Sequence, residues 1–114
     1  MTRLVKPHHV EAALEALSIA SAQQAAKAKA DEVRADEARK ATLSRLKREC
    51  NEAKSSVDRE DWARCQPAYR DACETYAKAA GVWEYHRDRR AKAEAILSAW
   101  QTEESTERAS RRMT

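Results

Sequence analysis

Bulky side chains recur every seven positions through the second half of the chain, and mostly smaller residues follow each of them three positions later. The first series is Trp62, Tyr69, Tyr76, Trp83, Arg90 and Leu97, and the second is Cys65, Ala72, Ala79, His86, Ala93 and Trp100. Positions spaced alternately by three and four residues share one face of an α-helix. The pattern therefore predicts a coiled-coil-like helix over residues 59–107, with these residues along one seam.

The first half of the chain predicts another long helix, over residues 8–54. Neither Gly nor Pro occurs in this range, and strong helix formers predominate. Pro7 suits the first helical turn, where its missing N–H group costs nothing. Apolar positions gather near the two ends of this helix, and the stretch from Ala22 to Ala41 holds mainly alanine and charged residues. The two apolar groups are Val10, Leu14 and Leu17, and Leu43, Leu46, Cys50, Ala53 and Val57.

The two predicted helices meet at Ser55-Ser56-Val57-Asp58, a cluster of residues that favour helix caps and turns. A short turn over residues 55–58, with Asp58 as N-cap of the second helix, makes the helices antiparallel. This register sets large rings of the second helix opposite the alanine stretch of the first. It also pairs Leu43 and Leu46 with Trp62, Cys65 and Tyr69, and it pairs Leu14 and Leu17 with Leu97 and Trp100.

Three features are expected to disturb the second helix. Pro67 removes one backbone hydrogen bond and should kink or break the helix near Cys65–Gln66. Gly81 is a second weak point, because glycine disfavours helix. Residues 108–114 are expected to form a frayed basic tail.

A single hairpin domain over residues 1–114 buries little apolar surface. At roughly 25 cal/mol per Å², one seam struggles to offset about 1–2 kcal/mol of backbone entropy for each ordered residue. We therefore expect the all-α hairpin to form a homodimer, most simply an antiparallel four-helix bundle. The residues off the seam that could serve this interface are Ile19, Val33, Val82, Tyr85 and Ile96.

Composition excludes several classes of protein. One Gly and two Pro in 114 residues argue against a sheet protein, and 36% charged residues, against about 25% in an average domain, argue against a membrane span. The sequence has no Gly-rich phosphate loop, HExxH motif or nucleophile elbow, so we expect neither an enzyme nor a bound cofactor. The N-terminus lacks the apolar segment of a signal peptide, which predicts a cytoplasmic protein with Cys50, Cys65 and Cys73 as thiols.

Two local patterns have a structural interpretation beside a functional one. His8-His9 could bind a metal ion, but adjacent histidines point about 100° apart on a helix, and solvated side chains explain them better. The cysteine spacing is not that of a zinc site, so no metal is expected. The heptad-spaced rings could stack on the bases of a single strand, although packing in the seam is the commoner role of such rings.

Basic residues form three groups. One lies between His86 and Lys92, and a second closes the chain, where the hairpin brings it beside Arg3 and Lys6. A third group, near the turn on the first helix, faces acidic residues and is expected to be partly neutralised. The candidate nucleic-acid-binding residues are Arg87, Arg89, Arg90, Lys92, Arg108, Arg111 and Arg112. An ordinary solvated surface and contact with an acidic protein remain alternatives.

Arg90 has a second expected role, because the heptad spacing places it on the seam. There it is expected to pair with Asp31 or Glu32 of a neighbouring helix. Its contribution to nucleic-acid binding therefore has to be separated from a contribution to folding.

An aromatic, basic and alanine-rich run between residues 69 and 112 ends in a Trp and an Arg-rich tail. Its residues are Tyr76, Trp83-Glu84-Tyr85, Arg87–Arg90, Ala93-Glu94, Ile96, Trp100 and Arg108–Arg112. This run resembles small phage-encoded helical proteins of the early and recombination genes. The resemblance implies a role in DNA metabolism in the cytoplasm of a bacterial host, and it assigns no functional residues.

The leading hypothesis is a non-enzymatic, oligomeric accessory factor in nucleic-acid metabolism. It would bind single-stranded DNA, or a host or phage protein loaded on DNA, through the basic residues. Two alternatives stay open: a protein-only adaptor or inhibitor of a host complex, and a structural coiled-coil spacer.

Overall fold

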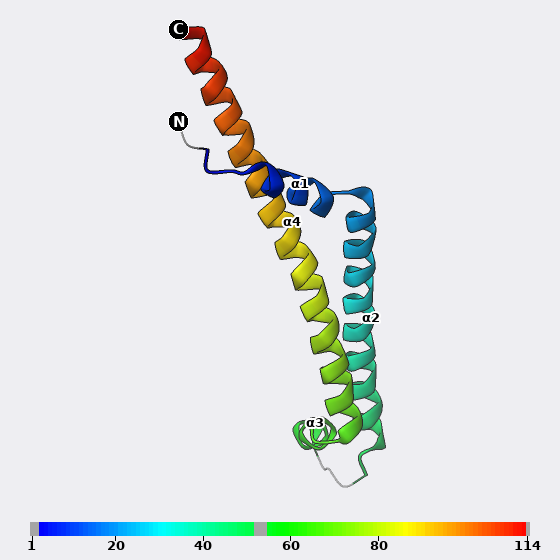
Figure 1. Ribbon diagram of the computed structural model, residues 1–114. Coiled ribbons are helices and arrows are strands. Elements are labelled where there is room, and N and C mark those ends of the chain that lie inside the picture. Colours follow the sequence, from blue (N-terminus) through cyan, green and yellow to red (C-terminus); the bar gives the residue numbers. More distant parts are fainter. Residues whose placement is uncertain (1–2, 52–54, 114) are drawn as a thin grey trace. The chain divides into compact units, whose positions relative to one another are not determined.

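The computed structural model describes residues 3–51 and 55–113, and these ranges form four α-helices (Figure 1). The helices are α1 (Pro7–Ala16), α2 (Ile19–Glu49), α3 (Ser56–Arg64) and α4 (Pro67–Met113). Neither range contains a β-strand, and the predicted all-α class is confirmed. Within the same residues, every helix is too short or too polar to cross a lipid bilayer.

The break predicted beside Pro67 is confirmed. Helix α3 ends at Arg64 and α4 begins at Pro67, so Cys65 and Gln66 separate the two helices. The Gln66 carbonyl accepts the backbone N–H groups of Tyr69 at 3.1 Å and of Arg70 at 3.2 Å, which closes the first turn of α4. Proline fits this first turn because its position needs no intrahelical donor.

A second break, between α1 and α2, corrects the continuous helix predicted over residues 8–54. The Leu17 N–H group still donates to Ala13 at 3.1 Å, and then the chain leaves the helix. Ser18 restarts it: the Ser18 hydroxyl accepts the Ser21 N–H at 3.1 Å, and the Ser18 carbonyl accepts the Ala22 N–H at 2.9 Å. Serine is among the best N-cap residues because its side chain satisfies one of the free N–H groups.

The turn predicted over residues 55–58 is also corrected. Helix α2 ends at Glu49, and residues 52–54, the last of the predicted first helix, lie outside the described residues. Ser55, rather than Asp58, is the N-cap of α3, because its hydroxyl accepts the Asp58 N–H at 3.1 Å. Asp58 lies within the first turn, where the helix dipole favours a negative charge.

Helix α4 is longer and more regular than the sequence predicted. It passes through Gly81 without interruption, and it continues to Met113, so the frayed tail predicted from residue 108 is wrong for the described residues. One exposed glycine costs about 1 kcal/mol relative to alanine, which neighbouring turns outweigh. An ion pair between Arg111 Nη2 and Glu107 Oε1, at 2.8 Å, supports the last turns.

The chain divides into two compact units, whereas the sequence predicts one hairpin domain. The middle unit comprises Ala26–Glu84, and the terminal unit combines the residues up to Ala25 with those from Tyr85 onward. Each unit is described by itself below.

In the middle unit, α2 and the first part of α4 run antiparallel, as Figure 1 shows. Lys29 lies over the Trp83 ring and Arg39 over the Tyr76 ring, so numbers rise along one helix as they fall along the other. The predicted seam rings are half-buried, while Ala28 and Ala35 are buried. The alanine stretch therefore faces Tyr76 and Trp83 as predicted.

The part of the predicted seam nearest residues 55–58 is only partly confirmed. Leu46 and Cys50 are buried and Leu43 is half-buried, but Val57 is 67% exposed and Cys65 is exposed. Both exceptions lie outside the long helices, in α3 and in the break beside Pro67. Ala53 lies outside the described residues.

The core of the terminal unit is built from small side chains. Ala13, Ala16 and Ala93 are buried, and the half-buried Leu17, Ile96 and Leu97 pack against them. Leu17 and Leu97 thus pack against the same buried cluster, whereas Leu14 is 58% exposed. The reason is helical geometry: Ala13, Ala16 and Leu17 share one face of α1, and Leu14 points about 100° away from Ala13.

Candidate nucleic-acid interface

Two of the predicted phosphate-binding residues, Arg89 and Arg90, are engaged with the break between α1 and α2. Arg89 Nη1 donates to the Ser21 hydroxyl at 3.3 Å, and Arg90 Nη1 donates to the Ala16 carbonyl at 3.5 Å. Both arginines are half-buried. The last carbonyls of a helix lack intrahelical partners and carry partial negative charge, so a guanidinium is a suitable partner for Ala16 at the end of α1.

Arg90 therefore lies on the seam as predicted, but with a different partner. Asp31 and Glu32, its expected partners, form ion pairs with Arg34 at 3.6 Å and with Lys29 at 3.0 Å. The sequence analysis missed this partner because it predicted an unbroken first helix, in which the Ala16 carbonyl would be bonded within the helix instead of lying free at a helix end.

Arg87 and Lys92, the other members of the first basic group, are exposed. Arg87 Nε lies 3.7 Å from the carboxylate of its neighbour Asp88, a surface contact between side chains that are 59% and 77% exposed. At about 100° per residue, Arg87 and Lys92 point about 140° apart around α4. They therefore belong to different faces of the helix.

The C-terminal group, Arg108, Arg111 and Arg112, is exposed on the last turns of α4. Arg87, Arg108 and Arg112 point within about 60° of one another around the helix axis, whereas Arg111 points about 100° away from Arg112. Arg87 and Arg112 are about 38 Å apart along the helix, at about 1.5 Å per residue. Three of the seven candidates therefore share one exposed face of α4.

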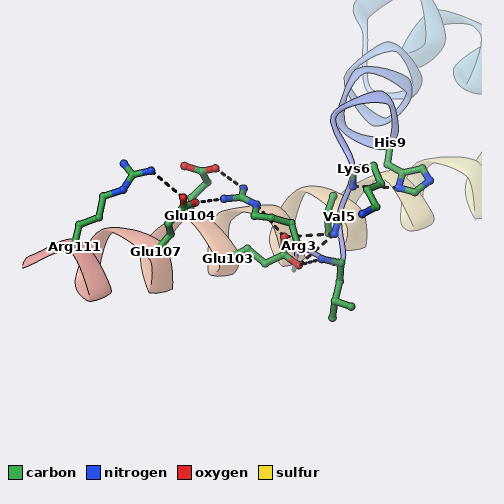
Figure 2. Close-up of polar contacts among 9 residues, drawn as sticks. Arg3, Val5, Lys6, His9, Glu103, Glu104, Glu107 and Arg111 are labelled. Carbon is green, nitrogen blue, oxygen red and sulfur yellow. Dashed lines mark hydrogen bonds and ion pairs between the residues drawn. The ribbon is translucent and has the colours of Figure 1, made fainter. Parts of the chain in front are cut away.

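Arg3, which the sequence grouped with the basic tail, is neutralised by carboxylates of α4 (Figure 2). Its guanidinium forms ion pairs with Glu104 and Glu107, and its Nε lies 3.4 Å from Glu103. The hydrogen bond to Glu104 and the nearby negative charges raise the pKa of Arg3. Proximity of the N-terminus to the tail was predicted, but these pairings were not.

His9 has a capping role that sequence analysis missed. Its Nδ1 accepts the backbone N–H of Lys6 at 3.3 Å, just before α1 begins at Pro7 (Figure 2). A histidine three residues after the N-cap can reach back to a free N–H group in this way, as Glu or Gln does in a capping box. Among the described residues, no three His, Cys, Asp or Glu side chains are grouped to hold a metal ion.

In the middle unit, cations lie over aromatic rings. The Arg39 guanidinium is 4.4 Å from the centre of the Tyr76 ring, and Lys29 Nζ is 5.3 Å from the centre of the Trp83 ring. A cation over a ring face is attracted by the ring quadrupole. These rings are half-buried in the helix pair, which favours the packing interpretation over a stacking platform for bases.

Local ion pairs neutralise part of the basic group on α2. Asp36 contacts Lys40 at 3.0 Å and Arg39 at 2.5 Å, and hydrogen bonds from Lys40 and then Arg39 lower the pKa of Asp36. Arg64 lowers the pKa of Glu60 through a hydrogen bond, with a smaller contribution from the charge of Lys47. Arg39 and Lys40 are thus paired within their own helix, rather than with the acidic residues expected to face α2.

Comparisons with protein-family models, with curated proteins and with solved structures give no match.

The three cysteines are free thiols: Cys50 is buried, Cys73 is half-buried and Cys65 is exposed. A hydrogen bond with Cys73 raises the pKa of Tyr69, and Arg64 Nη1 donates to the same phenol oxygen at 3.3 Å. These contacts belong to the packing of the middle unit beside the break at Pro67.

Proposed function

We propose that this protein is a non-enzymatic, oligomeric helical accessory factor in nucleic-acid metabolism. The observation that carries the proposal is the shared exposed face of α4 formed by Arg87, Arg108 and Arg112. These arginines would contact phosphates of single-stranded DNA, with exposed Arg111 on a flanking face and exposed Lys92 on nearly the opposite side of α4. The resemblance of residues 69–112 to phage-encoded early and recombination proteins agrees with such a role in a bacterial cytoplasm.

Contacts of this kind are independent of base sequence. A cation that meets a phosphate releases condensed counterions, so affinity falls steeply as the salt concentration rises. Arg89 and Arg90 are left out of the proposed contact surface, because their guanidinium groups already hydrogen bond to Ser21 and Ala16. Glu94 is the one acidic residue that shares the face between Arg87 and Arg108, so the face is predominantly positive.

The test is the salt dependence of binding to a fluorescent oligo-dT strand, measured by anisotropy from about 50 mM salt upward. Each phosphate contact on a single strand contributes about −0.7 to the log–log slope. Changing Arg87, Arg108 and Arg112 together to Ala should flatten the slope by about two units. The matched control changes Arg34, Arg45 and Arg70, three exposed arginines of the middle unit, and should leave the slope nearly unaltered.

Absence of binding by the unchanged protein at about 10 µM would contradict direct DNA binding. Equal flattening in the control would show that net charge alone, rather than this face, governs binding. Absence of binding would leave recognition of a DNA-bound protein, or the protein-only role, as the better explanation.

The proposed oligomer is a homodimer, most simply an antiparallel four-helix bundle. Four of the five residues expected at its interface are exposed: Ile19 by 81%, Val33 by 47%, Val82 by 52% and Tyr85 by 63%. Ile96 instead packs against the core of the terminal unit. In the described residues no large side chain is fully buried, so a second copy would add apolar burial that the single chain lacks.

Light scattering at micromolar concentration tests the dimer. The proposal expects a mass of at least twice 12.9 kDa, and a monomer with a cooperative melt would overturn it. The same exposed residues favour the second candidate function, a protein-only adaptor or inhibitor of a host complex. A monomer that binds no DNA would make that candidate the leading one.

A further inference from the structure

The N-terminal segment Arg3–Lys6, which we call the strap, is held on α4 by side-chain and backbone contacts together. Arg3 pairs with Glu103, Glu104 and Glu107. The Leu4 N–H donates to Glu103 Oε1 at 2.9 Å, and the Val5 N–H lies 3.2 Å from the same oxygen. Figure 2 shows these contacts converging on one side of the helix.

A groove of about 540 Å³ lies beside the strap, within the terminal unit. Trp100 and Val10 contribute apolar surface to it, Val5 and Pro7 come from the chain of the strap and the start of α1, and Arg3 and Glu104 add charge. A second groove, of about 450 Å³, includes Glu103 and Glu107 together with the 85% exposed Leu4. Arg3 lines both grooves, and its three carboxylate partners are divided between them: Glu104 lines the first, and Glu103 and Glu107 line the second.

These contacts define the chemistry of the segment that α4 accepts. Three carboxylates around one guanidinium select arginine, because lysine lacks the planar fork that bonds several oxygens at once. Two backbone N–H groups on Glu103 require an extended segment but no particular side chain. Val5, two residues after Arg3, lines the groove with Trp100, so an apolar residue suits that position.

The Arg3–Val5 part of the strap can leave α4 without unfolding α1, because Lys6 holds the helix start: its carbonyl accepts the His9 N–H at 3.0 Å and the Val10 N–H at 3.3 Å. Lys6, at its end, has extended backbone angles (φ −88°, ψ 153°), and Pro7 begins the helix. The cap at the start of α1 comes from His9 and does not involve Arg3 or the glutamates. Arg3 and its partners are 21–38% exposed, and ion pairs in contact with water are individually weak.

We propose that this surface of α4 is a docking site for an extended, arginine-bearing segment of a partner protein, and that the strap occupies it in cis as an internal competitor. The partner segment carries Arg followed two positions later by an apolar residue, the spacing of Arg3 and Val5. A tethered strap acts at an effective concentration of millimolar order, so a free segment binds the intact protein much more weakly than a protein whose strap is released.

Fluorine NMR of the full chain labelled with 5-fluorotryptophan tests the release. Trp62, Trp83 and Trp100 give separate signals, and Trp100→Phe assigns the third. Arg3→Ala should shift the Trp100 signal and leave those of Trp62 and Trp83 in place. Arg70→Ala, which removes an exposed arginine of α4 in the middle unit, is the control and should shift none. If Trp100 does not respond to Arg3→Ala, the proposal is overturned.

A synthetic peptide with the sequence of residues 3–10 then tests docking in trans. Added to the Arg3→Ala protein, it should return the Trp100 signal towards its original position, and a peptide with Ala in place of Arg should bind at least about tenfold more weakly. The peptide should also bind the original protein at least about tenfold more weakly than the Arg3→Ala protein. Equal binding to both proteins, or failure of the arginine peptide at millimolar concentration, would refute the docking site. DNA takes no part in this experiment, so its outcome is separate from that of the proposed function.

Discussion

The two units of the chain use basic side chains in different ways. In the middle unit, Lys29 and Arg39 lie over the rings of Trp83 and Tyr76 of α4, and their carboxylate partners, Glu32 and Asp36, lie on their own helix. In the terminal unit, Arg89 and Arg90 bind oxygen atoms at the break between α1 and α2, and Arg3 binds carboxylates. Where the seam offers large rings, the first helix is continuous; where the seam passes to Arg90, Ala93 and Leu97, that helix is broken. The role of an arginine or lysine in this chain therefore depends on the groups that surround it, and the residue type alone does not identify that role.

The largest expected effect comes from removing a ring of the middle unit. Trp83→Ala should lower the free energy of unfolding by about 3 kcal/mol, the lower end for a large aromatic side chain, because the ring is half-buried. Urea denaturation measures the loss. Val57→Ala, at a 67% exposed position, is the control and should change stability by less than about 0.5 kcal/mol. A similarly small loss for Trp83→Ala would indicate an exposed binding ring instead of a packed one.

The break between α1 and α2 sharpens the comparison next. Ser18→Ala removes the hydroxyl that accepts the Ser21 N–H group and should destabilise the protein by about 1 kcal/mol. Ser44→Ala, at an exposed position inside α2, is the matched control and should cost little or nothing. Equal unfolding midpoints for the two variants would mean that the cap does not maintain the break.

The breaks also show how much of the fold was predictable. The break between α3 and α4 is predictable from Pro67, because the missing N–H group and the ring of proline disfavour a position inside a helix. Ser18 gives a weaker signal, since serine occurs inside helices as well as at their ends. The heptad spacing alone identifies the rings of the seam, and in the structure these rings are half-buried rather than fully buried.

The candidate site was less predictable than the fold. Exposure of Arg87, Arg108 and Arg112 follows from their angular positions around α4, which take their side chains off the seam. The partners of Arg89 and Arg90 depend on the break at Ser18, and the partners of Arg3 depend on how the N-terminus crosses α4. Such contacts join residues far apart in the sequence, and periodicity carries no information about them.

Gly81 offers an opposite, smaller effect within the continuous part of α4. Apart from its chain neighbours and the backbone of the adjacent helical turns, no described atom lies within 4 Å of a Cβ built at this position, and the residue is exposed. Gly81→Ala should therefore raise stability by about 0.5–1 kcal/mol, since alanine loses less backbone entropy in a helix. Thermal unfolding measures the gain. A lower unfolding midpoint for Gly81→Ala would indicate that the missing side chain at Gly81 lets another chain pack closely against α4.

The smallest expected effect is a loss of stability in acid. Lys40 and Arg39 lower the pKa of Asp36 below its ordinary 3.8, and Arg64 lowers that of Glu60 below 4.5. Groups with lowered pKa values stabilise the folded state fully above their ordinary pKa, and this contribution is lost as the pH falls through the lowered values. Unfolding midpoints measured from pH 6 to 2 should therefore fall in the acid range. Asp36→Asn should reduce the slope, and an unchanged slope would exclude a contribution from these pairs.

The division of the arginines into folding and binding groups is tested most directly by two double variants compared side by side. Arg89→Ala with Arg90→Ala should lower stability by about 1 kcal/mol or more, through loss of two hydrogen bonds, and should leave the salt slope of oligo-dT binding unaltered under folding conditions. Arg108→Ala with Arg112→Ala should leave the unfolding midpoint in place and flatten the slope by about 1.4 units. Flattening of the slope by the first pair as much as by the second, in a protein that remains equally stable, would contradict this division of the arginines.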